Sequence, residues 1–294
     1  MKIVSSIYNI QELNNNIKNM DCALLMIPNI SLVYDDLDIE LALNICNSNN
    51  VIPIIALNKI YQPYELDNIK NILSKYANGN VYFYISDIGV ANIGIKMNII
   101  NKMIFNPETM ITNTCDLIEY KNLGFDSLAM SHEITYKDLI KSYNESKADL
   151  FYLGFGHRLM FYSKRHLVSL YANKNNTEYP TKDLYLREST REDFLPIIEN
   201  NNGTMIYRSY LISLIDEMDN LSFLKYFYLD SLYIDDDIYS KVLELAYKLN
   251  NNEVTKSDAI EDLKSFNLDI QDGFKYKDSV YQKEELKSWV NLNC

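Results

Sequence analysis

The sequence predicts an α/β barrel with eight parallel strands, and three observations support this prediction. Short apolar runs alternate with segments of helical spacing, which favours parallel strands joined by right-handed crossovers. Eight such runs lie outside one β-like interval, and eight strands close a barrel. The length of 294 residues suits one such barrel. The predicted fold is therefore a TIM-like (β/α)8 barrel.

Each predicted strand is a short, mostly apolar run, as expected for strands buried on both faces. In chain order they are Val4–Ile7, Cys22–Ile27, Val51–Leu57, Val81–Ile85, Lys102–Phe105, Ser127–Met130, Leu150–Leu153 and Tyr226–Leu229. Pro63 suits the first turn of a helix, Thr135 suits an N-cap and Gly124 suits a C-cap. The predicted helices are Ile10–Ile17, Leu37–Cys46, the helix that Pro63 opens, Asp116–Leu123, Thr135–Tyr143, Tyr210–Met218, Ile238–Leu249 and Lys256–Phe266.

The alternation breaks after residue 171. Asp183–Arg187, Phe194–Ile198 and Thr204–Tyr207 are short and β-like, and Asn202–Gly203 is a strong hairpin signal. We therefore expect a small β-rich insertion at residues 172–208, between the last two barrel strands. No internal repeat and no Pro/Gly/Ser-rich linker divides the chain, so residues 1–294 are expected to form a single domain.

The formal net charge of −12 favours cationic partners and opposes polyanions such as nucleic acids. Apart from the segment His157–His166, no basic stripe typical of a nucleic-acid binder is evident. The amino-terminal residues have no apolar signal core, and no stretch reaches the roughly 20 apolar residues that span a bilayer. We therefore expect a cytoplasmic protein that makes no membrane contact.

Polar residues follow several of the predicted strands. In a closed barrel the carboxyl ends of the strands face one shared mouth, where active sites lie. We expect Glu133, Asp87 and His132 to be catalytic, because burial and neighbouring groups can separate the pKa values of two carboxyls. The alternative is that each caps a helix or lies solvated on the rim. The residues expected at the mouth are Asn58, Asp87, Asn113, His132, Glu133, His157 and Arg158.

The segment His157–His166 contains two histidines and three cations. Guanidinium and ammonium groups bind carboxylates and phosphates, so the segment predicts an anion pocket for a carboxylate substrate or a tRNA phosphate. The alternative is a solvated amphipathic helix with Leu167 and Leu170 on its buried side. A metal site at the two histidines lacks identifiable further ligands. The residues expected to bind substrate are Asn58, Asn113, His157, Arg158, Ser163, Lys164, Arg165 and His166.

Protease motifs are absent from the sequence. His132 and Glu133 are not followed by the second histidine of HExxH, and no G-x-S-x-G segment occurs. Ser163 and His166 have a nucleophile–base spacing if both face one pocket, but no third group of a triad is identifiable.

Several segments, taken in order, resemble peptidase family U32. Asn113 and the run Ser131-His132-Glu133-Ile134 resemble an Asn-containing strand end and an S-R-E-(L/I) strand end of that family. The segment GFGHRLMFYSKRHLVSLY resembles a stretch with a Ser-Lys-Arg-like sequence. ENNNGTMIYRSYLISLI and DGFKYKDSVYQK resemble the elements (D/E)-x-N-G-T-x-(I/V)-(F/Y)-x-S and G-F-x-Y-K-x-S-V-Y. Together these segments cover most of the chain.

The resemblance implies a barrel fold and two activities. One is peptide hydrolysis, chiefly collagenase-like; the other is hydroxylation of RNA bases or quinone precursors, with a carboxylate co-substrate such as prephenate. It also implies that some members act as heterodimers of two U32 chains. Three functions follow: a component of tRNA hydroxylation acting with a cysteine-bearing U32 partner, a collagenase-like peptidase, and a non-catalytic partner or scaffold.

The chain departs from the family pattern at its cysteines. Where cluster-bearing members carry their first cysteine pair, this chain has Leu159 and His166, and the second pair has no counterpart before the final residue. Four thiolates for an iron–sulfur cluster cannot be assembled in the family manner, so we expect no cofactor to be held by this chain. The cysteines, which form no CxxC pair, are Cys22, Cys46, Cys115 and Cys294.

Overall fold

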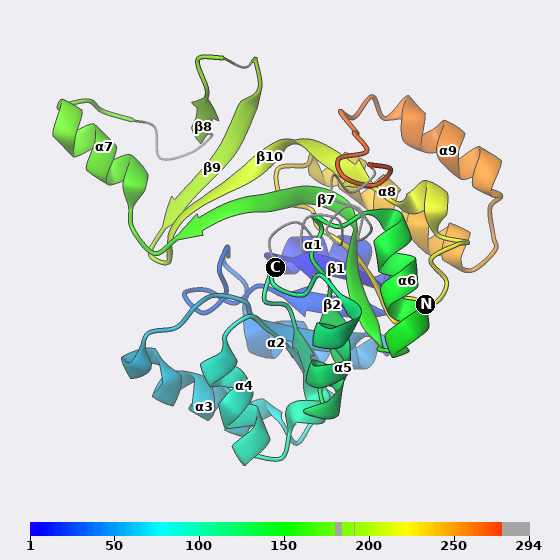
Figure 1. Ribbon diagram of the computed structural model, residues 1–294, viewed down its shortest axis with the longest axis horizontal. Helices are drawn as coiled ribbons and strands as arrows, with labels where there is room; N and C mark the ends of the chain where they lie inside the picture. Colours follow the sequence, from blue (N-terminus) through cyan, green and yellow to red (C-terminus); the bar gives the residue numbers. More distant parts are fainter. Residues whose placement is uncertain (180–183, 191, 278–294) are drawn as a thin grey trace, which may run out of the picture.

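Eight parallel strands form a closed ring in the computed structural model, which describes residues 1–179, 184–190 and 192–277 (Figure 1). The ring closes because β11 pairs in parallel with both β1 and β7, so that Tyr226 lies opposite Lys2 on one side and Phe151 on the other. The predicted TIM-like barrel is confirmed. In order around the ring the strands are β11 (Tyr226–Leu229), β1 (Lys2–Ile7), β2 (Cys22–Leu25), β3 (Ile52–Leu57), β4 (Tyr82–Ile85), β5 (Met103–Phe105), β6 (Ser127–Ala129) and β7 (Leu150–Ser163).

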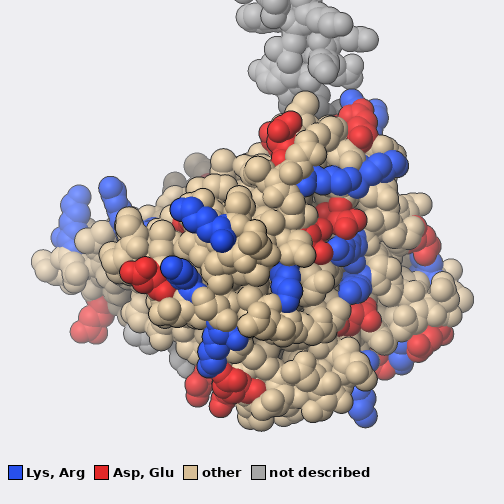
Figure 2. Space-filling model, turned by 90° about the horizontal axis from the view of Figure 1, so that it is seen from below, with Lys and Arg blue, Asp and Glu red and all other residues tan. Residues whose placement is uncertain are grey.

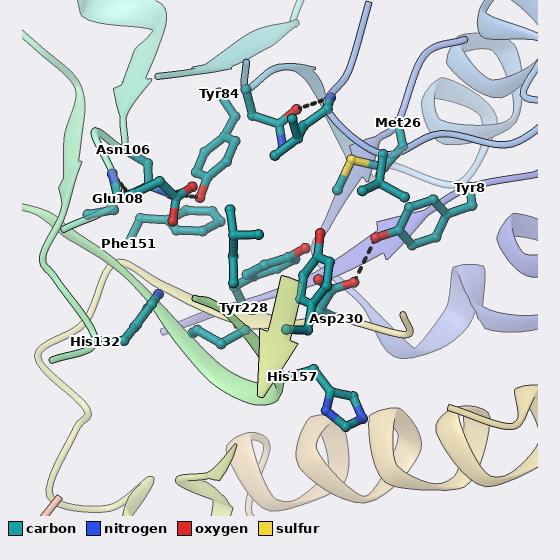
Figure 3. Close-up of a pocket in the computed structure, with 17 residues that line it drawn as sticks. Tyr8, Met26, Tyr84, Asn106, Glu108, His132, Phe151, His157, Tyr228 and Asp230 are labelled. Carbon is teal, nitrogen blue, oxygen red and sulfur yellow. Dashed lines mark hydrogen bonds between the residues drawn. The ribbon is translucent and has the colours of Figure 1, made fainter. Parts of the chain in front are cut away.

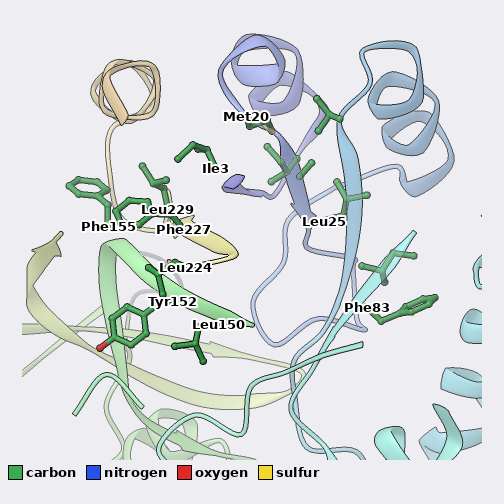
Figure 4. Packing of buried hydrophobic residues seen from close by; sticks show 14 of the residues in the cluster. Ile3, Met20, Leu25, Phe83, Leu150, Tyr152, Phe155, Leu224, Phe227 and Leu229 are labelled. Atoms are coloured by element: carbon green, nitrogen blue, oxygen red, sulfur yellow. The ribbon is translucent and has the colours of Figure 1, made fainter. Parts of the chain in front are cut away.

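The ring strands are buried on both faces, which explains their nearly continuous apolar sequences. Successive side chains point to opposite faces of a strand. In β2, Cys22 and Leu24 belong to the apolar cluster inside the ring, whereas Ala23 and Leu25 belong to the cluster under the helices. Figure 4 shows part of this outer cluster, with Ile3 and Phe227 packed beside the ring.

Helices connect most successive strands of the ring and cover its outside. Polar caps begin several of them: the side chain of Thr135, which the sequence predicts as an N-cap, and that of Asn113 each accept a backbone N–H of the first turn. α4 was not predicted, because Gly89 and Gly94 lower its helix propensity. The helices around the ring are α1 (Ile10–Asn16), α2 (Ile39–Ser48), α3 (Leu66–Tyr76), α4 (Ile88–Lys96), α5 (Thr114–Asn122), α6 (Tyr136–Ser146), α8 (Asp236–Asn250) and α9 (Lys256–Ser265). Short 3₁₀ helices are η1 (Ile17–Asn19), η2 (Pro63–Glu65), η3 (Ile100–Lys102) and η4 (Ile215–Glu217).

The outer half of β7 leaves the ring and continues into an antiparallel sheet with β10 (Gly203–Ser213), β9 (Phe194–Asn200) and β8 (Leu184–Arg187). These strands, the outer half of β7 and α7 (Leu167–Asn175) form a projection that we call the arm (Figure 1). The predicted hairpin at Asn202–Gly203 joins β9 to β10. Gly203 has φ +121°, and a Cβ atom there would lie 2.0 Å from the carbonyl oxygen of Ser163, so this turn requires glycine.

The predicted helix Tyr210–Met218 is wrong. β10 runs to Ser213, where its antiparallel ladder with β7 pairs Leu211 with His157, and only the short η4 follows. The apolar spacing of this segment suits a helix as well as a strand, and the ladder with β7 decides in favour of the strand. The amphipathic helix considered for His157–His166 is absent for the same reason, because β7 continues to Ser163 and α7 begins only at Leu167.

Parts of some predictions lie outside the described residues, namely Cys294, the start of the Asp183–Arg187 strand and the last half of DGFKYKDSVYQK. Of the helices that the structure describes, none combines the length and the apolarity that crossing a membrane requires.

Candidate active site at the barrel mouth

The carboxyl ends of the ring strands surround a cavity of about 70 Å³, which we call the mouth cavity (Figure 3). This volume holds a few water molecules. Figure 3 shows Glu108 and Asp230 on opposite sides of it, with Phe151 and Tyr228 between them. The side chains that line it are Tyr8, Met26, Leu32, Val33, Asn58, Tyr84, Asn106, Glu108, Ala129, His132, Phe151, Leu153, His157, Leu159, Tyr207, Tyr228 and Asp230.

Asp230 directly follows β11 and is one of two acids in the cavity. Its Oδ1 accepts hydrogen bonds from the Tyr8 hydroxyl at 3.0 Å and from the Leu232 backbone N–H at 3.2 Å. Burial raises the pKa of this carboxyl, although these hydrogen bonds act in the opposite direction. No lysine or arginine among the described residues forms an ion pair with Asp230, so the effect of burial on its pKa outweighs that of the hydrogen bonds.

Glu108, in the loop after β5, is the second acid. Asn106 orients it, because Asn106 Nδ2 donates to Glu108 Oε1 at 3.0 Å and also to the Tyr84 hydroxyl, while the Glu108 N–H donates to Asn106 Oδ1 at 3.1 Å. Glu108 has φ +57°, a backbone conformation that is unusual outside glycine and clusters at functional sites. Burial raises the pKa of Glu108 to about 7, so the carboxyl can exchange a proton near neutral pH.

Tyrosines supply most of the remaining polar groups of the cavity. Burial raises the pKa of Tyr8, Tyr84, Tyr207 and Tyr228 well above its usual value, so all four keep their hydroxyl protons. The ring of Phe151 lies 4.9 Å from that of Tyr84, centroid to centroid. The cavity therefore combines neutral hydrogen-bond donors, apolar ring faces and two carboxyls whose pKa values are raised by burial.

Two histidines face this region as neutral groups. Burial, together with the positive charge of Arg158, lowers the pKa of His132 to about 3, and the buried Nδ1 of His132 has no hydrogen-bond partner within the described part of the chain. Burial also lowers the pKa of His157, whose Nδ1 lies 2.8 Å from the carbonyl oxygen of Arg208. Both imidazoles can donate or accept a hydrogen bond without carrying charge.

The structure brings some of the predicted site residues together at the mouth. Asn58, His132 and His157 line the mouth cavity, and Arg158 and Glu133 border a second, smaller hollow that also contacts His132. Asn58 Oδ1 accepts the Leu32 N–H at 3.0 Å and so holds the loop after β2.

Two other predicted residues have capping positions and do not line the cavity. Asp87 Oδ1 accepts the N–H groups of Gly89 and Val90 at the start of α4, and Asp87 Oδ2 accepts that of Tyr61 at 3.0 Å. Asn113 caps α5. For Asp87 this geometry matches the capping alternative that the sequence left open, whereas for Asn113 the cap is a role that the sequence did not predict.

The cations at the end of β7 lie on the arm, apart from the mouth cavity. Lys164 Nζ forms an ion pair with Glu65 at 3.1 Å, and His166 Nε2 lies 3.0 Å from the carbonyl oxygen of Asn200. Ser163 Oγ accepts the Arg165 N–H at 3.2 Å. Because β7 is extended, Ser163 to His166 lie far along the strand from His157 and Arg158. They do not share one helix face with these two residues, as a helix would have allowed.

The two acids of the cavity were missed in the sequence, although one signal was present. Asp230 directly follows the eighth predicted strand, just as Asn58 directly follows the third. Glu108 lies three residues beyond β5, where only the structure shows that the loop turns its carboxyl inward.

The described cysteines do not fit an iron–sulfur cluster. Within the described ranges no three His, Cys, Asp or Glu side chains are arranged to hold a metal ion. Burial raises the pKa of Cys22 and Cys46 to about 12, which disfavours the thiolate form that ligates metals. Cys115 is exposed on α5.

The fold and the mouth cavity agree with the class of protein that the sequence indicates. Residues 34–284 match the family model of peptidase family U32, and the chain belongs to this family. It is similar to tRNA hydroxylation protein P2 of Bacillus subtilis (strain 168), with 24% identity over 202 residues. That match covers 61% of this chain and 64% of the relative, which is less than two thirds of the relative's length. The structure of the U32 peptidase Mk0906 shares the fold, with a TM-score of 0.50 and 8% identity over 78% of this chain and 92% of that one.

Proposed function

We propose that this chain is a component of tRNA hydroxylation and that the mouth cavity is its substrate site. The likeness to tRNA hydroxylation protein P2 carries the proposal. The chemistry of the cavity is consistent with it, because Glu108 and Asp230 can hold or move a proton beside four tyrosine hydroxyls in a largely buried space.

The charge of the chain bears on how tRNA is bound. The net charge of −12 opposes a polyanion, and on the face shown in Figure 2 positive and negative side chains are interspersed without forming one broad basic patch. We therefore propose that a second U32 chain acts together with this one. The second chain would contribute contacts to tRNA and a redox centre held by cysteines, because the described residues of this chain include no group of ligands that could hold a metal ion.

The peptidase alternative has less support from the geometry. Ser163 and His166 hydrogen-bond to separate backbone groups on the arm, those of Arg165 and Asn200. Neither lines the mouth cavity. This alternative rests on the name of the family.

The experiment is a nucleoside profile of tRNA, measured by mass spectrometry, from a strain in which the gene is deleted. We expect the deletion to remove a hydroxylated nucleoside, and wild-type protein and the matched control Asp67→Asn, an exposed acid of α3, to restore it. Asp230→Asn should fail to restore it while accumulating normally. An unchanged profile in the deletion strain would refute the function, and full restoration by Asp230→Asn would refute the site.

A further inference from the structure

One side of the mouth cavity combines a carboxyl group with several aromatic rings. The carboxyl group is that of Asp230, which lies beside the ring of Tyr8 (Figure 3). The ring of Phe151 lies 5.3 Å from that of Tyr228, centroid to centroid. A cation is attracted both by a carboxylate and by the face of an aromatic ring. The phenylalanine and tyrosine rings that line the cavity are those of Tyr8, Tyr84, Phe151, Tyr207 and Tyr228.

No cation within the described part of the chain compensates the charge of Asp230 through an ion pair. Burial raises the pKa of the four tyrosines, and the negative charge of Asp230 acts in the same direction on each of them. The nearest strong positive charge acts elsewhere. Burial and then the charge of Arg158 lower the pKa of His132, at the border with the smaller hollow. The space beside the tyrosines is therefore negative whenever Asp230 is ionised.

The rim of the cavity beside Asp230 is acidic as well. β11, β1 and β2 are neighbours in the ring, so the loops that follow them lie side by side. Burial raises the pKa of Glu12 to about 7, and the negative charges of Asp236 and Asp35 act in the same direction, which shows that the three loops are close together. No lysine or arginine occurs in residues 8–16, 28–39 and 230–238. The further acids of these segments are Asp36, Asp38, Asp235 and Asp237.

Helix capping explains only part of this acidic rim. Asp38 caps α2 and Asp235 caps α8, each by accepting a backbone N–H of the first turn. Asp35 and Asp36 are exposed and cap none of the described helices. A cleft lined by charges of one sign raises the local concentration of ligands of the opposite sign. The rim therefore favours the entry of a cation into the cavity and opposes that of an anion.

The cavity also has an acceptor that the chain leaves unused. His132 lines the cavity, and its buried Nδ1 has no hydrogen-bond partner among the described residues. A buried polar atom without a partner destabilises a fold, and a ligand that donates a hydrogen bond would remove this cost. The cavity volume of about 70 Å³ admits only a few non-hydrogen atoms. A small, positively charged donor fits this combination of size, charge and acceptors.

We infer that the mouth cavity binds the primary ammonium group of an organic amine, with the nitrogen beside the carboxylate of Asp230 and the adjoining carbon atoms against the rings of Phe151 and Tyr228. The three N–H donors of an ammonium group match carboxylate and phenol oxygens. Free amines and lysine side chains both carry this group. The inference goes beyond the proposed function, because this ligand is not RNA and its binding excludes a substrate from the same space.

The test is a titration of the purified full chain with ethylammonium chloride, followed through the NMR signals of the cavity tyrosines. Sodium chloride keeps the ionic strength constant, ethanol is the neutral counterpart and acetate is the anionic one. We expect ethylammonium to bind with a Kd on the order of 1–10 mM, as its small size allows, and ethanol and acetate not to bind there. Asp230→Asn should weaken ethylammonium binding by about tenfold or more. Asp67→Asn, at an exposed acid of α3, should bind as wild type does.

Phe151→Leu provides a second variant, which removes a ring face and keeps the charge of Asp230. It should weaken ethylammonium binding by about threefold or more, and it still decides the matter if Asp230→Asn does not fold. Equal binding of ethanol and ethylammonium, tighter binding of acetate, or unchanged ethylammonium binding in both variants would overturn the inference.

A further pair of probes identifies the source of the ammonium group. If the N-acetyl amide of lysine binds more tightly than butylammonium, the natural ligand is a lysine side chain of a polypeptide; if it binds less tightly, the ligand is a free amine. Because no tRNA modification is measured, failure of ethylammonium to bind leaves the nucleoside profile unaffected. An unchanged nucleoside profile likewise leaves the binding result intact.

Discussion

The hydroxyl of Tyr8 donates a 3.0 Å hydrogen bond to the carboxylate of Asp230, linking the residue that follows the first ring strand to the residue that follows the last. The strands β1 and β11 are neighbours in the ring, so this contact lies at the point where the barrel closes. This hydrogen bond therefore both connects the two strands that close the ring and orients an acid of the mouth cavity.

Tyr8→Phe should destabilise the protein and raise the pKa of Asp230 further. The variant leaves a buried carboxyl with one donor fewer, which costs on the order of 1–2 kcal/mol in the free energy of unfolding. Urea denaturation measures the first effect, and carbon-detected NMR titration of the carboxyl measures the second. Tyr64→Phe, which changes a tyrosine that is 81% exposed, is the control and should leave both quantities unchanged. A Tyr8→Phe protein as stable as wild type would show that the contact contributes nothing.

Glu108 should make stability fall as pH rises. Burial raises the pKa of Glu108 from 4.5 to about 7, so the folded protein binds this proton more tightly than the unfolded chain does. The stabilisation from the bound proton is complete below about pH 4.5 and is lost as pH rises through about 7.

Glu108→Gln isolates this effect, since glutamine does not ionise. The free energies of unfolding of variant and wild type should differ little near pH 4 and should favour the variant by on the order of 3 kcal/mol near pH 8. Burial raises the pKa of Glu12 to about 7 as well, so the stability of wild type alone would vary with pH for two reasons. The difference between wild type and the variant isolates the contribution of Glu108. A difference that is independent of pH would contradict the prediction.

Lys59→Met should loosen the attachment of the arm to the barrel. The side chain of Lys59 is 5% exposed, and its Nζ donates to Glu65 Oε1 at 2.9 Å and to Asn202 Oδ1 at 2.7 Å. Burial acts to raise the pKa of Glu65, but hydrogen bonds from the Gln62 backbone, Lys59 and Lys164 outweigh it and lower this pKa to about 2. We expect the variant to lose about 2 kcal/mol of stability in urea denaturation.

Lys75→Met is the matched control for that measurement. Lys75 also forms an ion pair with a glutamate, Glu40, but the two side chains are 61% and 58% exposed. Solvent screens such a pair, so its removal should cost much less. Equal losses for the two lysine variants would show that burial of Lys59 does not strengthen its contacts.

Gly203→Ala should destabilise the β9–β10 hairpin. A methyl group there would collide with the backbone of Ser163, and φ +121° is unfavourable for alanine. Thermal melting should show a lower midpoint, and hydrogen exchange should show the loss of protection in β9 and β10. At Gly79 an added Cβ atom would make only ordinary contacts of 3.6 Å, so Gly79→Ala should behave as wild type does. Unchanged exchange in Gly203→Ala would count against the assigned turn.

The ring was predictable because burial on both faces leaves a short continuous apolar run, as in the segment that became β2. The arm was predictable only in part. Asn202–Gly203 marks its hairpin locally, but the outer half of β7 and the end of β10 are strands because they pair with each other, and such pairing between distant segments leaves no local signal. The apolar spacing of Tyr210–Met218 predicted a helix, and the pairing of residues 211–213 with β7 makes the start of this segment a strand instead.

The site was less predictable than the fold. A polar residue after a strand was predicted to lie at the mouth, and Asn58 and His157 do line the mouth cavity. The same pattern at Asp87 instead marks the N-cap of a helix. Spacing cannot separate these two uses, because both place a polar residue after a strand and before a helix. Glu108 depends on an unusual backbone angle in its loop.

Closure of the ring by β11 has a consequence for synthesis of the protein on the ribosome. Until Tyr226–Leu229 has emerged, the facing edges of β1 and β7 have no ring partner. A nascent chain of more than two hundred residues therefore exposes two hydrogen-bonding edges that attract other extended segments. Chaperone protection during translation should matter most in that interval and end abruptly when the last ring strand inserts.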